Sequence, residues 1–123
     1  MRKLTGALAA MAFLAAACGG GGGGGGGQPE GSTKVSLTEF SFSPASIQVK
    51  SGKAVFYLVN VGKSAHDMVI EKPGGGQVAK SDLIQPGDST VLTVDNLAAG
   101  DYTFICDQPG HESAGMKGTL KAS

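Results

Sequence analysis

The chain of 123 residues is long enough for one folded domain, and its formal charge is balanced, with 10 basic and 10 acidic residues. It has no basic cluster and no interleaving of basic and aromatic residues, which argues against nucleic-acid binding. The chain holds only two cysteines and two histidines, so a pattern that involves them carries information.

The first segment, residues 1–17, has the pattern of an export signal. Arg2 and Lys3 precede an apolar run from Leu4 to Ala17. This run is shorter than the roughly 20 residues that a membrane-spanning helix needs. We therefore expect residues 1–17 to be a signal peptide that sends the protein to the periplasm or the cell surface.

The second segment, residues 18–32, is dominated by the glycines of 19–27 and is expected to be a flexible tether. Cys18 and the residues before it resemble the lipobox of bacterial lipoproteins, although Ala15 stands where that motif prefers Leu. The resemblance implies lipidation of Cys18 and a membrane anchor, because a tether is useful when its end is held. The alternative is cleavage after Ala17 that releases a soluble protein.

Residues 33–123 form the expected folded domain. Runs rich in β-branched and aromatic residues alternate with turn signals, and no long amphipathic helix is indicated. The expected strands cover residues 35–42, 47–49, 54–60, 65–71, 89–94, 102–106 and 117–122. The first run changes phase near Glu39, which predicts a bulge or bend, and residues 78–84 could be a strand or a helical turn. About seven or eight short strands predict an all-β Greek-key sandwich or barrel.

One short loop carries most of the functional signal. Cys106, His111 and Met116 follow one another with four residues in each gap, and Pro109-Gly110 and Gly115 keep the segment out of helix and strand. The other histidine, His66, lies 40 residues before Cys106, and strand pairing in a sandwich can bring it beside the loop.

These four side chains offer two imidazoles, one thiolate and one thioether. A thiolate and two imidazoles with a weak axial methionine describe a blue-copper electron-transfer site. The set also explains Cys106, since an exported domain with one cysteine has no internal disulfide and a metal would protect the thiol. We therefore predict a single copper ion held by His66, Cys106, His111 and Met116.

The domain resembles the cupredoxin family, with loop spacing similar to that of auracyanin- and sulfocyanin-like proteins. The resemblance rests on the Cys…His…Met loop and on the segments Phe42-Ser43-Pro44, Ser51-Gly52, Pro86-Gly87, Gly100-Asp101-Tyr102 and Gly115-Met116-Lys117-Gly118. It implies a Greek-key sandwich in which His66, Cys106 and His111 are equatorial ligands and Met116 is axial. Many members have Asn where this chain has Asp67, so the link between the two ligand-bearing segments is expected to differ here.

The expected function is to carry single electrons between membrane-associated redox proteins, as a monomer and not as an enzyme. Both histidines are used by one copper ion, which leaves none for the further copper centres of oxidases. His111 is the ligand through which electrons are expected to enter and leave. The expected docking rim around it consists of Pro109, Gly110, Ala114 and Met68. Copper storage or delivery and a metal-free scaffold are the alternatives. Glu39 is expected to be a solvated strand or turn residue.

Overall fold

A computed structural model describes residues 27–123, and within this range the chain forms strands, turns and loops only. The strands are β1 (Thr33–Thr38), β2 (Ser41–Ser43), β3 (Ser46–Val49), β4 (Gly52–Asn60), β5 (Val69–Glu71), β6 (Gln77–Lys80), β7 (Ser89–Leu97), β8 (Gly100–Ile105) and β9 (Lys117–Ala122). None of the described residues belongs to a helix that could cross a bilayer. The signal peptide, Cys18 and the glycines up to 26 lie outside the described residues.

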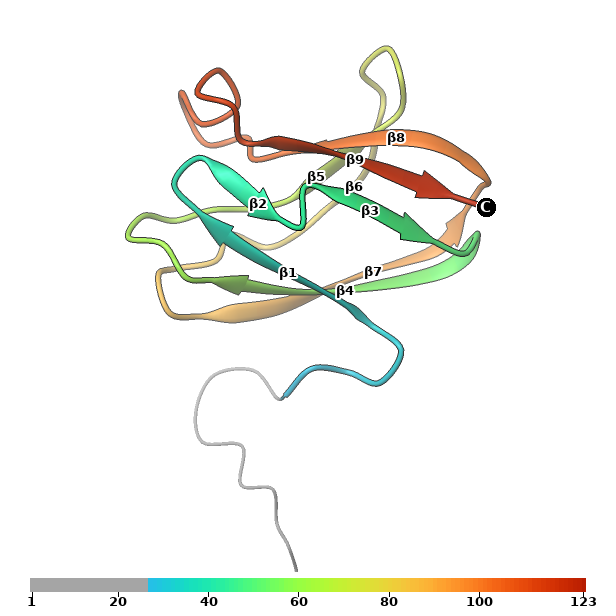
Figure 1. Cartoon of the computed structure of the whole chain (residues 1–123), viewed down its shortest axis with the longest axis horizontal. Helices are drawn as coiled ribbons and strands as arrows, with labels where there is room; N and C mark the ends of the chain where they lie inside the picture. Colours follow the sequence, from blue (N-terminus) through green and yellow to red (C-terminus); the bar gives the residue numbers. More distant parts are fainter. Residues whose placement is uncertain (1–26) are drawn as a thin grey trace, which may run out of the picture.

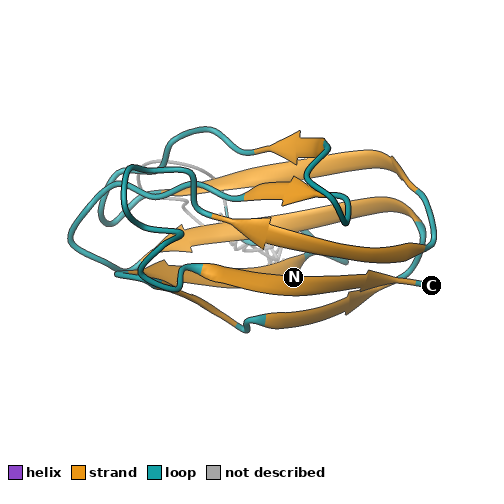
Figure 2. Cartoon of the chain, turned by 90° about the horizontal axis from the view of Figure 1, so that it is seen from above, coloured by secondary structure: helices purple, strands orange, loops and turns teal. Residues whose placement is uncertain are grey.

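The strands form two sheets, ordered β2-β1-β4-β7 and β3-β9-β8-β5-β6. Figures 1 and 2 show the two layers stacked face to face. Pairs β1–β4 and β3–β9 are parallel, and the other pairs are antiparallel. Strands that are near in sequence, such as β2 and β3, lie in different sheets. This arrangement confirms the predicted all-β sandwich. It has nine strands in the described range, because the run 35–42 is divided into β1 and β2 and residues 77–80 form a further strand.

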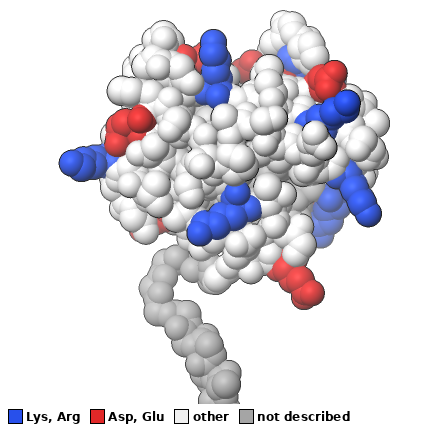
Figure 3. Space-filling view, in the orientation of Figure 1, with Lys and Arg blue, Asp and Glu red and all other residues white. Residues whose placement is uncertain are grey.

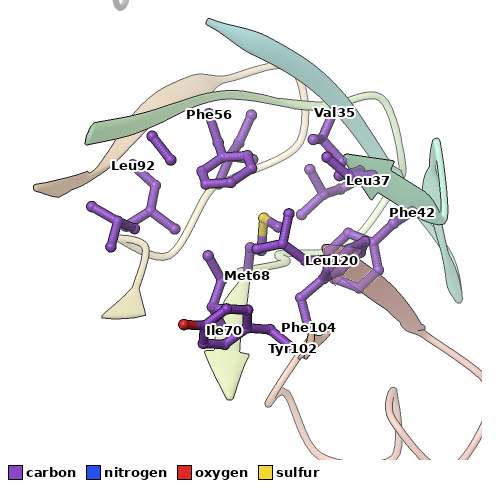
Figure 4. Packing of buried hydrophobic residues seen from close by; sticks show 14 of the residues in the cluster. Val35, Leu37, Phe42, Phe56, Met68, Ile70, Leu92, Tyr102, Phe104 and Leu120 are labelled. Carbon is purple, nitrogen blue, oxygen red and sulfur yellow. The ribbon is translucent and has the colours of Figure 1, made fainter. Parts of the chain in front are cut away.

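The core lies between the sheets and follows the alternation of side chains along each strand. In β7, Leu92 and Val94 point inward and are at least nine-tenths buried, whereas Val91 is 44% exposed. Figure 4 shows Phe56 and Leu92 of one sheet facing Ile70 of the other. Each such side chain contributes about 1.5–3 kcal/mol when fully buried.

The bulge or bend predicted near Glu39 is a tight turn, which interrupts the run 35–42. β1 and β2 pair antiparallel with Thr38 opposite Ser41, so Glu39 and Phe40 are the two turn residues of a hairpin. Phe40 adopts a φ of 81°, which is rare for a residue with a large side chain. The change of phase in the sequence marks this turn, and it exposes both side chains at one end of the sandwich.

The strand expected at 65–71 is shorter in the structure, and so is the ambiguous run 78–84. Strand β5 begins at Val69, and residues 77–80 form strand β6 instead of a helical turn. His66 stands outside both strands and makes an isolated bridge with Ile84, with N–H to carbonyl distances of 3.1 and 2.8 Å. This bridge fixes the backbone of His66 where the loops gather.

Four connections meet at one end of the sandwich, on the left in Figures 1 and 2 and opposite the C-terminus. They are the β1–β2, β4–β5, β6–β7 and β8–β9 connections. Charged side chains of both signs are scattered over the face shown in Figure 3, without a large patch of one sign. Residues of the expected copper site all lie in or beside these connections.

Candidate metal centre

Cys106 and Met116 close the β8–β9 connection at its base. Cys106 directly follows β8, and its backbone N–H donates to the carbonyl of Met116 at 3.2 Å. The N–H of Met116 in turn donates to the carbonyl of His111 at 3.0 Å. Gly110 and Gly115 adopt φ values of 79° and 107°, which glycine accepts without strain. The loop is therefore compact and brings its three predicted ligands together.

Three donor atoms form a small triangle. The Nδ1 atoms of His66 and His111 are 3.2 Å apart, and the sulfur of Cys106 is 3.8 Å from the first and 3.5 Å from the second. The point equidistant from these atoms lies about 2.0 Å from each, which is the length of a metal–imidazole bond. The three donor atoms are thus close enough together to bind one metal ion.

Burial distinguishes the ligands from one another. His66, Cys106 and Met116 are 0% exposed, whereas His111 is partly exposed. Burial raises the pKa of the Cys106 thiol, because a thiolate without a counter-charge is poorly solvated there. A bound metal ion supplies that counter-charge. The buried thioether of Met116 completes a soft donor set that suits copper in both oxidation states.

Glu39 is the exposed turn residue that the sequence predicts, and it also contacts the outer nitrogen of His66, which the sequence did not indicate. Its Oε1 atom lies 3.1 Å from Nε2 of His66 and accepts from the N–H groups of Lys63 and Ser64 at 2.7 and 2.8 Å. The Ser64 hydroxyl donates to the same oxygen at 2.9 Å. The backbone donors of Lys63 and Ser64 lower the pKa of Glu39 to about 2, so the group is a carboxylate at neutral pH.

Asn60 organises the loop that carries His66. It is 1% exposed, and its Nδ2 donates to the carbonyls of Ser64 and Ile84, both at 2.8 Å. Its Oδ1 accepts from the N–H of Gly62 at 2.9 Å. One buried amide therefore joins the β4–β5 connection to Ile84, the bridge partner of His66. The sequence analysis missed this residue, because an Asn at a strand end is common in ordinary turns.

Asp67 joins the two ligand-bearing segments. Its Oδ1 accepts from the N–H of Asp107 at 2.9 Å, and Asp107 pairs with Lys80 at 2.6 Å. Desolvation, followed by the nearby Asp107 carboxyl, raises the pKa of Asp67 to about 6. The carboxyl of Asp67 therefore differs from an amide in its charge, as expected. It still accepts the hydrogen bond that joins the two segments.

Three of the four residues predicted for the docking rim are exposed, and their role in docking stays a prediction. Pro109, Gly110 and Ala114 are exposed beside His111. Met68 is 0% exposed and packs in the core, so it was wrongly assigned to the rim. The apolar side chain that covers the site is Phe40, which is 45% exposed and meets the ring of His111 edge-on, with centroids 5.3 Å apart.

Two imidazoles, a buried thiolate and a buried thioether at the loop end of a β-sandwich define a type 1 copper site. The comparisons agree with this class. A family described as copper binding proteins, plastocyanin/azurin family, matches residues 29–123. The chain therefore belongs to the plastocyanin/azurin family of copper-binding proteins.

Individual relatives span most of the domain. A plastocyanin of Scenedesmus fuscus is 33% identical over 64% of this chain and 83% of its own length. The copper-resistant cuproprotein CopI of Pseudomonas aeruginosa is 28% identical over 76% of each. An auracyanin structure from Roseiflexus castenholzii superposes with a TM-score of 0.68, at 21% identity, and covers 75% of this chain and 96% of its own. That structural likeness shows the shared fold.

Proposed function

We propose that the protein is an exported carrier of single electrons, tethered at the membrane through a lipid on Cys18, and that electrons pass through His111. The observation that supports this role most strongly is the unequal burial of the ligands. His66 and Cys106 are closed off from solvent, and His111 alone of the two imidazoles reaches the surface. Bound copper would supply a one-electron couple, with His66, Cys106, His111 and Met116 as the residues that would hold it.

The chain's own residues suit electron exchange better than catalysis. Backbone hydrogen bonds join Cys106, His111 and Met116 within the loop, which suits a site that keeps one geometry in both oxidation states. Cys106 and Met116 are closed to solvent, which favours a carrier over an enzyme that binds substrate at the metal. With both histidines of the chain used, a second copper centre built from imidazoles has no donors.

The apolar surface around His111 would be the docking site for redox partners. Pro109, Gly110, Ala114 and Phe40 are exposed around the ring and carry no charge. A small apolar patch of this kind suits short-lived redox encounters, which bury little area. The partners themselves would be redox proteins at the same membrane, within reach of the tether.

The rate of electron self-exchange between the Cu(I) and Cu(II) forms tests this docking site. The substitution Ala114→Glu places like charges against each other when two copies meet, so exchange should slow about tenfold or more. Val91→Glu is the matched control, because Val91 is 44% exposed on strand β7. NMR line broadening measures the rate. Equal rates in both variants would contradict electron transfer through this surface.

Membrane attachment is tested separately by the substitution Cys18→Ser. In a bacterial host we expect the unchanged chain to begin at Cys18, to carry acyl chains by mass spectrometry and to sediment with membranes. The variant should lose all three properties. A mature protein with an unmodified Cys18 would overturn the anchor and leave a freely diffusing exported carrier.

Copper storage or delivery is a second candidate, supported by the similarity to a copper-resistant cuproprotein. A delivery protein should release copper readily in one oxidation state, whereas a carrier should hold it in both. Incubation of the Cu(I) form with a Cu(I) chelator separates the two roles. Transfer within seconds would favour delivery, and retention through repeated redox cycles favours the carrier.

A further inference from the structure

The turn between β1 and β2 contacts both histidine ligands of the copper site. Phe40 covers the ring of His111, and Glu39 contacts His66 on the side away from the donor triangle. The Nδ1 atom of His66 faces His111 and Cys106, which leaves Nε2 to carry the proton and to donate to Glu39. The carboxylate is therefore joined to the copper position through one imidazole ring.

We propose that Glu39 is a positioning residue that fixes the ring of His66. Its negative charge, beside Nε2, favours Cu(II) over Cu(I) and so lowers the reduction potential. A carboxylate that accepts from the outer nitrogen of a ligating histidine orients the ring and makes it a stronger donor. A stronger donor stabilises the more highly charged metal ion. The inference rests on the copper site and does not depend on which proteins exchange electrons with it.

The surroundings of Glu39 are built to hold this contact. Two backbone N–H groups and one hydroxyl, from Lys63 and Ser64, converge on the same oxygen that meets His66. A side chain in a simple solvated turn would not collect three donors from a segment 24 residues away. The carboxylate is thus fixed from the β4–β5 connection while it contacts the ligand.

Gly62 leaves the space that the contact needs. A Cβ atom at this position would lie 2.5 Å from Oε1 of Glu39 and 3.0 Å from Nε2 of His66. Both atoms of the contact would be affected, and backbone bonds hold His66 in place. A side chain at position 62 should therefore push Glu39 away from the ring without removing its charge from the chain.

The reduction potential of Glu39→Gln tests the charge. The amide keeps an oxygen for the donors of Lys63 and Ser64, so a purely structural role predicts an unchanged potential. The proposal predicts that the ratio of Cu(II) to Cu(I) affinity falls about tenfold, which raises the potential by about 59 mV for one electron. The side chain of Glu39 is 31% exposed, and solvent screening places the effect near the lower end of the range for such partners.

Two further variants make the test specific. Asp101→Asn removes a carboxylate at the other end of β8 and should leave the potential unchanged. Gly62→Ala should raise the potential in the same direction as Glu39→Gln, because the contact is broken. In the Cu(I) form, the Nε2 proton of His66 should give an NMR signal protected from solvent exchange, and this protection should be lost in Glu39→Ala.

Each outcome decides the matter. A raised potential in both Glu39→Gln and Gly62→Ala, with Asp101→Asn unchanged, supports the proposal. A potential in Glu39→Gln that moves no more than in Asp101→Asn overturns it. A shift in Glu39→Gln alone, with folded Gly62→Ala at the original potential, would show that the contact with His66 is not the route and would also overturn it.

Discussion

Asp67 accepts a hydrogen bond from the backbone N–H of Asp107 across 2.9 Å, so the residue after one copper ligand holds the residue after another. Strands β5 and β8 also pair next to this bond, with Val69 opposite Ile105. The bond extends this strand pairing towards the copper site and helps to hold His66 beside Cys106 when copper is absent.

Two substitutions of Asp67 separate the effect of its hydrogen bond on stability from the effect of its charge. Asp67→Ala leaves the N–H of Asp107 without its partner, and the free energy of unfolding of the copper-free protein should fall by about 1–3 kcal/mol. Asp67→Asn keeps an acceptor oxygen and removes a poorly solvated charge, so stability should be unchanged or higher. Urea unfolding at neutral pH measures both. An equal loss in the two variants would show that the hydrogen bond is not what matters.

Asn60 should matter for stability and for copper affinity together. Asn60→Ala removes two donors from the carbonyls of Ser64 and Ile84 and should lower the free energy of unfolding by about 1–3 kcal/mol. Because the same loop carries His66, copper should also bind more weakly in a competition titration. Asn96→Ala, at an exposed position of β7, is the matched control and should change neither quantity.

Gly118 should tolerate no side chain. An added Cβ would overlap the ring of Phe104 and lie 2.5 Å from the carbonyl oxygen of Ala45. Gly118→Ala should therefore lower the free energy of unfolding by about 1–3 kcal/mol through overpacking. In Gly76→Ala the nearest atom, on Lys72, lies at 3.7 Å, so its stability should stay close to the original. Equal unfolding curves for the two variants would contradict this packing.

The ion pair of Lys80 should make stability depend on alkaline pH. The Asp107 carboxylate raises the pKa of Lys80. The pair therefore stabilises the fold fully below the ordinary lysine pKa of about 10.4, and this contribution is lost as pH rises through the higher folded-state value. The difference in unfolding free energy between the unchanged protein and Lys80→Gln should shrink above that pH. With Lys50→Gln as control, a difference that stays constant would argue against the pair.

The ligands could be predicted from the sequence because their spacing and rarity constrain them. Cys106, His111 and Met116 share one loop, and His66 is the only other histidine of the chain. Their chemistry selects a metal whatever the details of the fold. The strands were predicted where side chains alternate clearly, as in β7 and β9, because one face of each is buried and the other is exposed.

The residues around the ligands could not be predicted in the same way. Glu39 contacts His66 only because a hairpin turn brings it to the loop end, and its local sequence fits an ordinary exposed turn. Met68 was assigned to the docking rim, whereas Met68, Val69 and Ile70 are all buried. Such contacts depend on tertiary packing, which overrides local pattern.

The visible spectrum of the protein with one equivalent of Cu(II), before and after ascorbate, tests the central claim most directly. We expect an intense thiolate-to-copper band that disappears on reduction and returns on reoxidation, and that is absent in Cys106→Ser. A colourless Cu(II) protein, or one that loses its copper on reduction, would contradict a redox-active copper site formed by His66, Cys106, His111 and Met116.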